Sequence, residues 1–234
     1  MSSVSEPSAG PSLKDAIPLR ERKFARTKMA LLDATLERLK HKSLAEITVR
    51  ELCDAAEVSE ATFFNYFKKK DDLLRYFIQV WTLEVQLDAD QRAGRDAGVA
   101  YIEAIFAHTA ERMRDNPRVM LEIIGHMALC SEAPEDCSHP TLTLAERVQR
   151  FPDLADAAVV ADECEVDTMF RTAVERAVTR KELPESVNVD LVVGMLLSVF
   201  FGTPLWQGHV DMERIADLYA AQLATVWAGL RSAR

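Results

Sequence analysis

Apolar residues recur at helical spacing along most of the chain. The first clear example begins near Arg22, where Met29, Leu32 and Leu36 share one face, which predicts a helix ending near residues 41–43. The same type of pattern recurs in segments 74–85, 102–113, 120–127, 141–150, 166–177, 189–203 and 212–231. The sequence shows neither the alternation of strands nor a repeat of fixed period. We therefore predict an all-α fold with nine to ten helices.

The pattern also predicts parts of the arrangement. Asn116-Pro117 separates two of the helical segments, which we expect to be antiparallel neighbours. Segment 189–203 is apolar nearly all round, so most of its faces must be covered. Residues 1–19 are rich in Ser, Pro and small residues and lack periodicity, which predicts a disordered arm.

Residues 48–67 have the pattern of two short helices joined by a tight turn. Thr48 followed by Glu51 is a capping box at the start of the first helix. Glu57 and Val58 form the turn, and Ser59 is the N-cap of the second helix. This arrangement is a helix-turn-helix, which is typical of units that read DNA.

The second short helix divides into an inward and an outward face. Phe63, Tyr66 and Phe67 form the inward stripe. The residues left to face outward are Glu60, Ala61, Thr62, Phe64 and Asn65. The outward residues are therefore the candidates for contact with DNA.

The charge of the chain is distributed unevenly. The net charge is −9, but residues 1–80 carry 14 Lys and Arg against 12 Asp and Glu, a net of +2, while residues 81–234 carry 14 against 25, a net of −11. Basic residues cluster at positions 20–28 and 68–70, on both sides of the helix-turn-helix. Because phosphate binding requires Lys and Arg, the first part of the chain is the part suited to DNA.

The sequence also bears on other classes of protein. Its most apolar stretch, Leu191–Trp206, is 16 residues long and is broken by Gly, Ser and Pro, against roughly 20 needed to cross a bilayer. With no apolar signal segment, we expect a cytoplasmic protein. The motifs of common enzyme classes are missing, so we expect no enzyme and no cofactor. Cys130, Cys137 and His139 leave a structural zinc site one ligand short, and we predict no metal.

Residues 22–75 resemble the TetR family of one-component transcriptional regulators. The resemblance is carried by Ile47-Thr48-Val49, by Val58-Ser59, by segment 62–67 (Thr-Phe-Phe-Asn-Tyr-Phe) and by Lys70-Asp71-Asp72-Leu73. Three positions depart from the common pattern of the family: Phe64 replaces a Tyr, and Glu57 and Ser43 each replace a Gly. The resemblance implies a DNA-binding head of three to four helices at residues 20–70, followed by a helical effector-binding and dimerisation domain at residues 71–234.

The resemblance also implies roles for individual residues. Thr48 and Lys70 would hold phosphates, segment 59–66 would enter the major groove, and Asn65 would read a base edge. Arg26 would reach a phosphate or the minor groove. The full DNA-binding set is Arg26, Thr48, Val49, Ser59, Glu60, Ala61, Thr62, Phe64, Asn65, Tyr66 and Lys70.

In this family the middle helices usually enclose an effector and the last two helices form a dimer. The expected lining, which suits an apolar ligand, is Phe106, His108, Met113, Met120, Ile124, Met127, Met169 and Phe170. The expected dimer interface is Leu196, Phe200, Tyr219 and Trp227. Packing in the core of a single chain explains both sets equally well.

The predicted function is therefore that of a repressor. It would bind a pseudo-palindromic operator as a homodimer and be released by a small apolar molecule. The alternative is a helical protein-interaction adaptor, or an effector-insensitive regulator, in which DNA binding is lost or altered.

Overall fold

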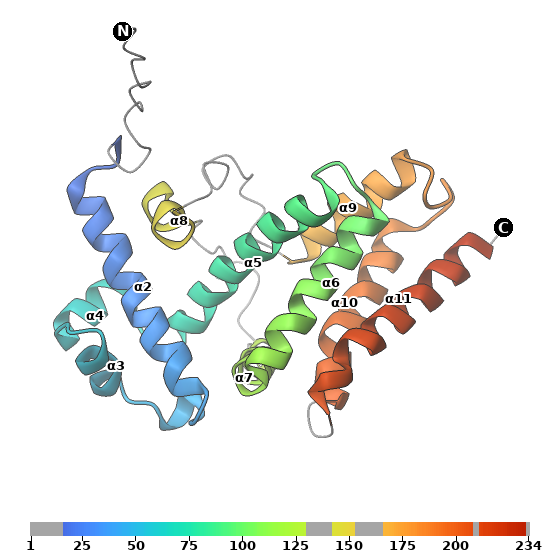
Figure 1. Ribbon diagram of the computed structural model, residues 1–234. Helices are drawn as coiled ribbons and strands as arrows, with labels where there is room; N and C mark the ends of the chain where they lie inside the picture. Colours follow the sequence, from blue (N-terminus) through green and yellow to red (C-terminus); the bar gives the residue numbers. More distant parts are fainter. Residues whose placement is uncertain (1–15, 130–141, 153–165, 208–210, 233–234) are drawn as a thin grey trace, which may run out of the picture.

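A computed structural model describes residues 16–129, 142–152, 166–207 and 211–232 (Figure 1). Within these ranges the chain forms ten α-helices and no strand, which confirms the predicted all-α fold. The helices are α2 (Leu19–Leu39), α3 (Val49–Ala55), α4 (Glu60–Tyr66), α5 (Asp72–Ala93), α6 (Val99–Asp115), α7 (Pro117–Leu129), α8 (Leu144–Arg150), α9 (Val166–Thr179), α10 (Val189–Gln207) and α11 (Ile215–Ser232). Two 3-10 turns, η1 (Leu44–Glu46) and η4 (Met212–Arg214), precede α3 and α11.

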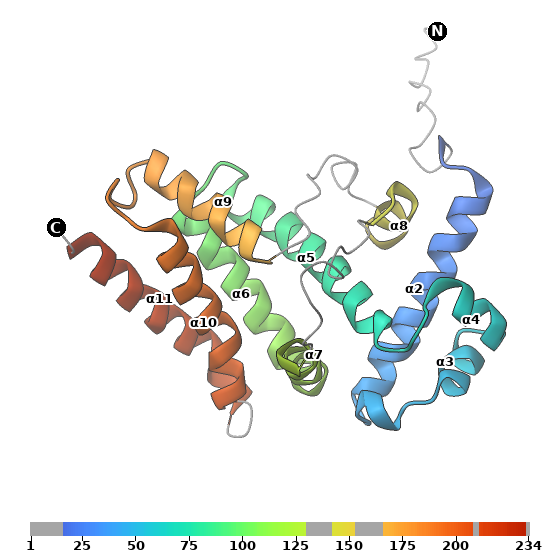
Figure 2. The ribbon, with the colours of Figure 1, turned by 180° about the vertical axis from the view of Figure 1, so that it is seen from behind.

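Helices α2, α3 and α4 and the first two turns of α5 form a unit that we call the head. Leu32 of α2, Leu52 of α3, Phe63 of α4 and Leu73 of α5 are fully buried in its centre. In Figures 1 and 2, α3 and α4 lie together on one side of α2, at the end of the molecule opposite to α10 and α11. The three-to-four-helix arrangement expected for this part of the chain is therefore present.

Helix α5 connects the head to the remaining helices, which we call the body. It continues to Ala93, into the polar stretch that begins at Asp88. The polar side chains are accommodated by ion pairs, because Arg92 bonds to Asp88 (2.7 Å) on its own helix and to Glu111 (2.8 Å) on α6. The helix ends at Gly94, whose φ of 86° is easily adopted only by glycine.

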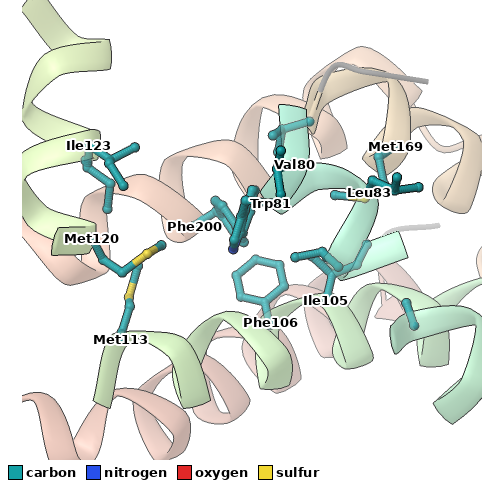
Figure 3. Packing of buried hydrophobic residues seen from close by; sticks show 14 of the residues in the cluster. Val80, Trp81, Leu83, Ile105, Phe106, Met113, Met120, Ile123, Met169 and Phe200 are labelled. Atoms are coloured by element: carbon teal, nitrogen blue, oxygen red, sulfur yellow. The ribbon is translucent and has the colours of Figure 1, made fainter. Parts of the chain in front are cut away.

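The body is built around aromatic side chains from four helices. The Phe106 ring of α6 lies 5.2 Å from Phe200 of α10 and 4.8 Å from Tyr219 of α11, both nearly edge to face. Phe170 of α9 lies 5.4 Å from Phe200. Figure 3 shows Trp81 of α5 beside Phe200 and close to Phe106, so this cluster also anchors the helix that leads to the head.

The start of α6 packs very closely against α9. A Cβ at Gly98 would lie 2.4 Å from the Cα of Ala177, so only glycine allows this approach. The backbone N–H of Val99 donates to the carboxylate of Glu182 (2.7 Å), which satisfies a free donor at the helix start.

Helix α7 differs from the expected antiparallel arrangement. It begins at Pro117, and in Figures 1 and 2 it is seen end-on while α6 is seen along its length. The chain turns sharply at Asn116, whose φ of −143° and ψ of 64° leave the helical region. Helix α7 therefore crosses α6, and its other neighbours are α10 and α2.

Helix α8 packs on the N-terminal half of α2. Ala145 and Val148 form a small separate core with Ile17 and Ala25. The carboxylate of Glu146, which is almost fully buried, pairs with the ammonium of Lys28. An element from the second half of the sequence is thus joined to the head.

Helix α10 is, among the described residues, the one helix long and apolar enough to cross a membrane, over Val189–Trp206. A core helix passes the same test, and α10 packs against α9 and α11. Only a third of this segment is buried within the chain. The large apolar side chains left exposed on α10 are Leu191, Met195, Leu205 and Trp206.

The four residues expected at a dimer interface face the other way. Leu196, Phe200, Tyr219 and Trp227 are all at least 96% buried within the single chain. The Tyr219 hydroxyl donates to the carbonyl of Phe200 (2.7 Å), which holds α11 against α10. The interface prediction was therefore wrong for these residues, because the more apolar face of α10 and of α11 covers the aromatic core of its own chain.

Candidate nucleic-acid interface

Helix α3 begins with the predicted capping box. The Glu51 N–H donates to the Thr48 hydroxyl (3.2 Å), and the Thr48 N–H donates to the Glu51 carboxylate (2.9 Å). Lys42 also donates to Glu51 (2.6 Å). These hydrogen bonds, that from Lys42 first, lower the pKa of Glu51 to about 2. The start of the helix-turn-helix is therefore set by local bonds around one carboxylate.

The turn between α3 and α4 has a left-handed residue at the expected place. Glu57 has a φ of 55°, a conformation that costs a residue other than glycine roughly 1 to 2 kcal/mol. The chain tolerates this because the Val58 N–H donates to the carbonyl of Cys53 (3.0 Å) and closes the turn. The departure from the common glycine is therefore accommodated without loss of the motif.

Helix α4 presents the outward face that the sequence predicts. Ser59 caps it, since the Thr62 N–H donates to the Ser59 hydroxyl (3.1 Å). Phe63 is fully buried, whereas the Phe64 side chain is 53% exposed. The other exposed residues of the helix are Glu60, Ala61 and Asn65. This uncovered face suits readout in a major groove, because an Asn amide can bond to an adenine edge and a Phe ring can contact a thymine methyl group.

Tyr66 joins this face to the start of α2. Its ring lies 4.4 Å from the ring of Phe24, edge to face, and Phe24 is itself partly exposed. Arg20 and Lys23, exposed residues of the same α2 turn, are therefore held next to the C-terminal end of α4. Phe24 was not among the residues predicted from the sequence, although an aromatic residue inside a basic segment is a signal that points to it.

Arg26 is exposed but lies on a different side of α2. It follows Phe24 by two positions, which is about 200° round a helix, so it points away from the contact with α4. Arg20 and Lys23 are consequently better placed than Arg26 to meet a phosphate beside α4.

Lys70 also differs from its expected role. Its ammonium donates to the carbonyls of Leu44 (2.5 Å), Ala45 (3.1 Å) and Ile47 (2.7 Å). An ammonium has three donors, and all three are directed into the chain. Lys70 therefore holds η1 against the start of α5 and has no proton left for a phosphate, whereas the neighbouring Lys68 is exposed.

The remaining predicted DNA contacts have mixed surroundings. Thr48 and Ser59 are exposed but use their hydroxyls in caps. Val49 and Tyr66 are half-buried and pack on the core. These four residues position the outward face, whereas Phe64 and Asn65 are left to meet DNA directly.

Most residues expected to line an effector pocket are packed in the core of the body. Phe106, Met113, Met120, Ile124, Met169 and Phe170 are all buried. The cavity beside them, next to Trp81 and Phe200, has a volume of about 20 Å³, which is room for one water molecule. Their burial fits core packing, the alternative that the sequence left open, but Met120 also lines a cavity of about 300 Å³ and Phe106 lines one of about 550 Å³ beside α11.

His108 faces α5 rather than the middle helices. Its Nδ1 lies 3.3 Å from the Asp88 carboxylate and its Nε2 lies 3.7 Å from the Glu84 carboxylate. The side chain of Met127, together with Cys130, Cys137 and His139, lies outside the part of the chain that the structure describes.

Comparison with known proteins agrees with this geometry. The family of bacterial regulatory proteins described as the tetR family matches residues 31–77, which cover most of the head. No protein of curated function matches the sequence.

Solved structures of low sequence identity share the fold over almost the whole chain. FadR of Thermus thermophilus, a TetR family transcriptional repressor in complex with lauroyl-CoA, is 15% identical, with a TM-score of 0.61 over 87% of this chain and 94% of that one. FadR of Bacillus subtilis, in complex with stearoyl-CoA, is 13% identical, with a TM-score of 0.63 over 86% and 98%. A cysteine mutant of the TetR family regulator CifR, complexed with 26-bp operator DNA, is 17% identical, with a TM-score of 0.53 over 84% and 94%.

The match covers the helix-turn-helix, and the fold is shared from α2 to α11. Through this match, residues 31–77 are assigned to the tetR family of bacterial regulatory proteins, a family of transcriptional regulators and not of enzymes, and the chain has the fold of solved TetR family regulators.

Proposed function

We propose that this protein is a cytoplasmic transcriptional repressor that binds a pseudo-palindromic operator as a homodimer and is released by a small molecule. The observation that carries the proposal is the outward face of α4, where Phe64 and Asn65 are exposed beside the basic first turns of α2. The contact between Phe24 and Tyr66 fixes these two surfaces relative to each other. Base contacts from α4 and phosphate contacts from α2 are then made together.

Selection of binding sites from random double-stranded DNA tests the proposal. We expect an enriched site with two half-sites related by a dyad, protected from cleavage by the full-length protein. Its affinity should fall steeply between low and physiological salt, because Lys and Arg displace counterions from phosphates. Failure to enrich any site would favour the alternative, an adaptor that has lost DNA binding.

Two features of the chain favour the second candidate function, that of a protein-interaction adaptor. Phe64 lacks the hydroxyl that a Tyr would offer to a phosphate, and the chain as a whole carries a net charge of −9. Both features weaken attraction to DNA. The Phe64→Tyr variant separates the two candidates, because it should strengthen binding to a selected operator and leave an adaptor function unchanged.

The outward face of α10 is the proposed dimer interface. Leu191 is 60% exposed and Trp206 is 72% exposed, and Met195 and Leu205 are exposed with them. Gly194 and Gly202, where an added Cβ would meet nothing, lie on the same helix and would let a second helix approach closely. A large exposed apolar surface at the end of the molecule away from the head is typical of an interface.

A dimer is also what DNA binding requires. One short recognition helix such as α4 contacts too few base pairs for specific binding, so two heads on one site are expected. Equilibrium sedimentation at micromolar concentration should give twice the chain mass of 26.2 kDa. A monomer under these conditions would remove the dimer from the proposal.

Two observations support release by a small molecule: the two FadR proteins form complexes with acyl-CoA, and this chain has a separate head and body. The small core cavity beside Trp81 and Phe200 has no room for an acyl chain among the described residues. The effector of this protein is therefore proposed to bind elsewhere.

A further inference from the structure

A cavity of about 300 Å³ lies where the head meets the body. Its lining residues come from α2, α5, α6, α7 and α8, which are far apart in the sequence. Figures 1 and 2 show where these five helices lie. The lining residues are Asp33, Leu36, Glu37, Lys40, Phe77, Trp81, Glu84, Arg112, Asn116, Val119, Met120 and Arg150. Of the residues predicted from the sequence to line an effector pocket, Met120 alone is among them.

One wall is apolar and contains a buried donor without an acceptor. Leu36, Phe77 and Met120 supply aliphatic and aromatic surface. Trp81, which also lines the cavity, is only 7% exposed, and its indole N–H has no hydrogen-bond partner among the described residues. Because a buried N–H without an acceptor is destabilising, an oxygen of a bound molecule would be stabilised there.

The rest of the lining is charged, with the guanidinium groups of Arg112 and Arg150 and the ammonium of Lys40 beside the carboxylates of Asp33, Glu37 and Glu84. Arg112 forms a tight ion pair with Glu84. Arg150 lies 3.5 Å from Asp33 and 3.9 Å from Glu84, both longer than the roughly 2.7 to 2.9 Å of a strong charge-assisted hydrogen bond. The Arg150 guanidinium thus has donors that no short bond in the described chain satisfies.

Asp33 is the nearer of the two partners of Arg150, but at 3.5 Å its contact is long for an ion pair. Burial raises the pKa of Asp33, and the charge of Arg150 offsets this only in part. The Asp33 side chain is also more exposed than that of Glu84. A carboxylate that enters the cavity would therefore compete with Asp33 for Arg150.

We propose that this junction cavity binds a small monocarboxylic acid with an aliphatic or aromatic body and that its occupation moves the head. The acid group would bind Arg150, and the body would lie on Leu36, Phe77 and Met120. The volume equals that of about ten water molecules, which limits the ligand to roughly ten to twenty non-hydrogen atoms and leaves out an acyl-CoA. The regulatory half of this proposal rests on the proposed function.

The route from the cavity to the head runs through α8 and α2. Arg150 ends α8, which is held to α2 by the Lys28–Glu146 pair and by the apolar group around Ala25. Asp33 and Leu36 belong to α2 itself. A ligand that replaces Asp33 as the partner of Arg150 loosens α2 from α8, and it favours the head orientation in which the cavity is widest.

The binding half is tested by calorimetry on the full-length protein, with octanoate and 4-phenylbutyrate as probes and their methyl esters as uncharged controls. We expect one site per chain and at least about tenfold weaker binding of the esters. Arg150→Gln should weaken binding of the acids about tenfold, whereas Asp33→Asn should strengthen it, because it removes the competing carboxylate. Arg114→Gln, an exposed arginine of α6 outside the cavity, is the matched control and should change nothing.

The opposite signs at Arg150 and Asp33 separate a binding role from a structural one. A variant that only disturbed the fold would weaken binding at both positions, and thermal unfolding of each variant checks this directly. Equal affinity of the acids for the native protein and for Arg150→Gln would overturn the site, as would equal affinity for acids and esters.

The regulatory half is tested on a selected operator. A saturating acid should lower operator affinity of the native protein and of Arg114→Gln but not of Arg150→Gln. Binding of the acid with unchanged operator affinity would overturn the regulatory half and leave the site. If no operator is found, the proposed function fails, while the calorimetry still decides whether the site exists.

Discussion

Lys68 and Lys70 belong to the same basic run, and their side chains have different surroundings. Lys68 is exposed, while the Lys70 ammonium donates to three carbonyls of segment 44–47. At the scale of single residues, the basic side chains of the head are therefore of two kinds. Some are exposed and can contact DNA, and others stabilise the fold of the head. The same division separates Lys23, beside α4, from Lys28, which pairs with Glu146.

Lys70→Ala should destabilise the protein, because three carbonyls lose their donor. We expect a loss of roughly 1 to 3 kcal/mol in the free energy of unfolding, measured with denaturant. Lys68→Ala is the matched control, and it should leave stability unchanged. It should also make the slope of log operator affinity against log salt concentration shallower by about one. Equal stability of the two variants would contradict the assignment.

Asn65→Ala should weaken binding to a selected operator by about 1 to 3 kcal/mol, because an amide that bonds to an adenine edge is lost. Specificity should relax at one base pair of each half-site, as read by repeating the selection with the variant. Gln149→Ala, an exposed amide on α8, should not change binding. A uniform loss over all sequences would assign Asn65 to phosphate instead.

At the scale of elements, the two short helices of the motif depend on bonds made within a few residues. Thr48 and Glu51 cap α3, Ser59 caps α4, and the left-handed Glu57 sets the turn between them. The caps and the turn can each be altered by a substitution that leaves Phe64 and Asn65 in place. The motif therefore offers tests of stability that are separate from DNA contact.

The stability of α3 should depend on pH through Glu51. Because its pKa is lowered to about 2 in the folded chain, the carboxylate stabilises the fold above its usual pKa of 4.5, and this contribution is lost as the pH falls toward 2. The native protein should be more stable than Glu51→Gln at neutral pH, with the difference shrinking below pH 4.5. Denaturant unfolding over this range measures it, and Glu185→Gln, in an exposed loop, is the control.

Glu57→Gly should stabilise the protein by about 1 kcal/mol, because glycine adopts the φ of 55° without strain. Asp54→Gly, an exposed position inside α3, should have the opposite sign and a similar size. Melting temperatures of both variants decide the matter. Destabilisation by Glu57→Gly would mean that the glutamate side chain makes a contact that outweighs the strain.

At the scale of the whole molecule, the head and the outward face of α10 lie at opposite ends, and α5 and α8 join the body to the head. A dimer through α10 would place two heads on the same DNA, as a pseudo-palindrome requires. The junction cavity lies between these ends, where a ligand can alter how the heads are held.

Met195→Glu should convert the dimer into a monomer, because a charge would be buried in an apolar interface. We expect operator affinity to fall by at least about tenfold, since each head would then bind alone. Sedimentation and operator titration measure the two effects. Leu19→Glu, an equally apolar exposed position on α2, should leave the protein dimeric, and a dimeric Met195→Glu would place the interface elsewhere.

The sequence by itself determined the helices, the caps at Thr48 and Ser59, the turn at Glu57 and the outward face of α4. These features depend on residues within about four positions of one another, so a local pattern contains the information. The family resemblance rests on the same local segment.

Only the tertiary structure decided which face of α10 packs against its own chain, where the protons of Lys70 are directed and which helices enclose the junction cavity. Each depends on partners far away in the sequence: Phe200 on Tyr219, Lys70 on segment 44–47, and Arg150 on Asp33. The sequence of a helix that is apolar nearly all round does not reveal which face is buried, because the volume and shape of its neighbours determine how it packs.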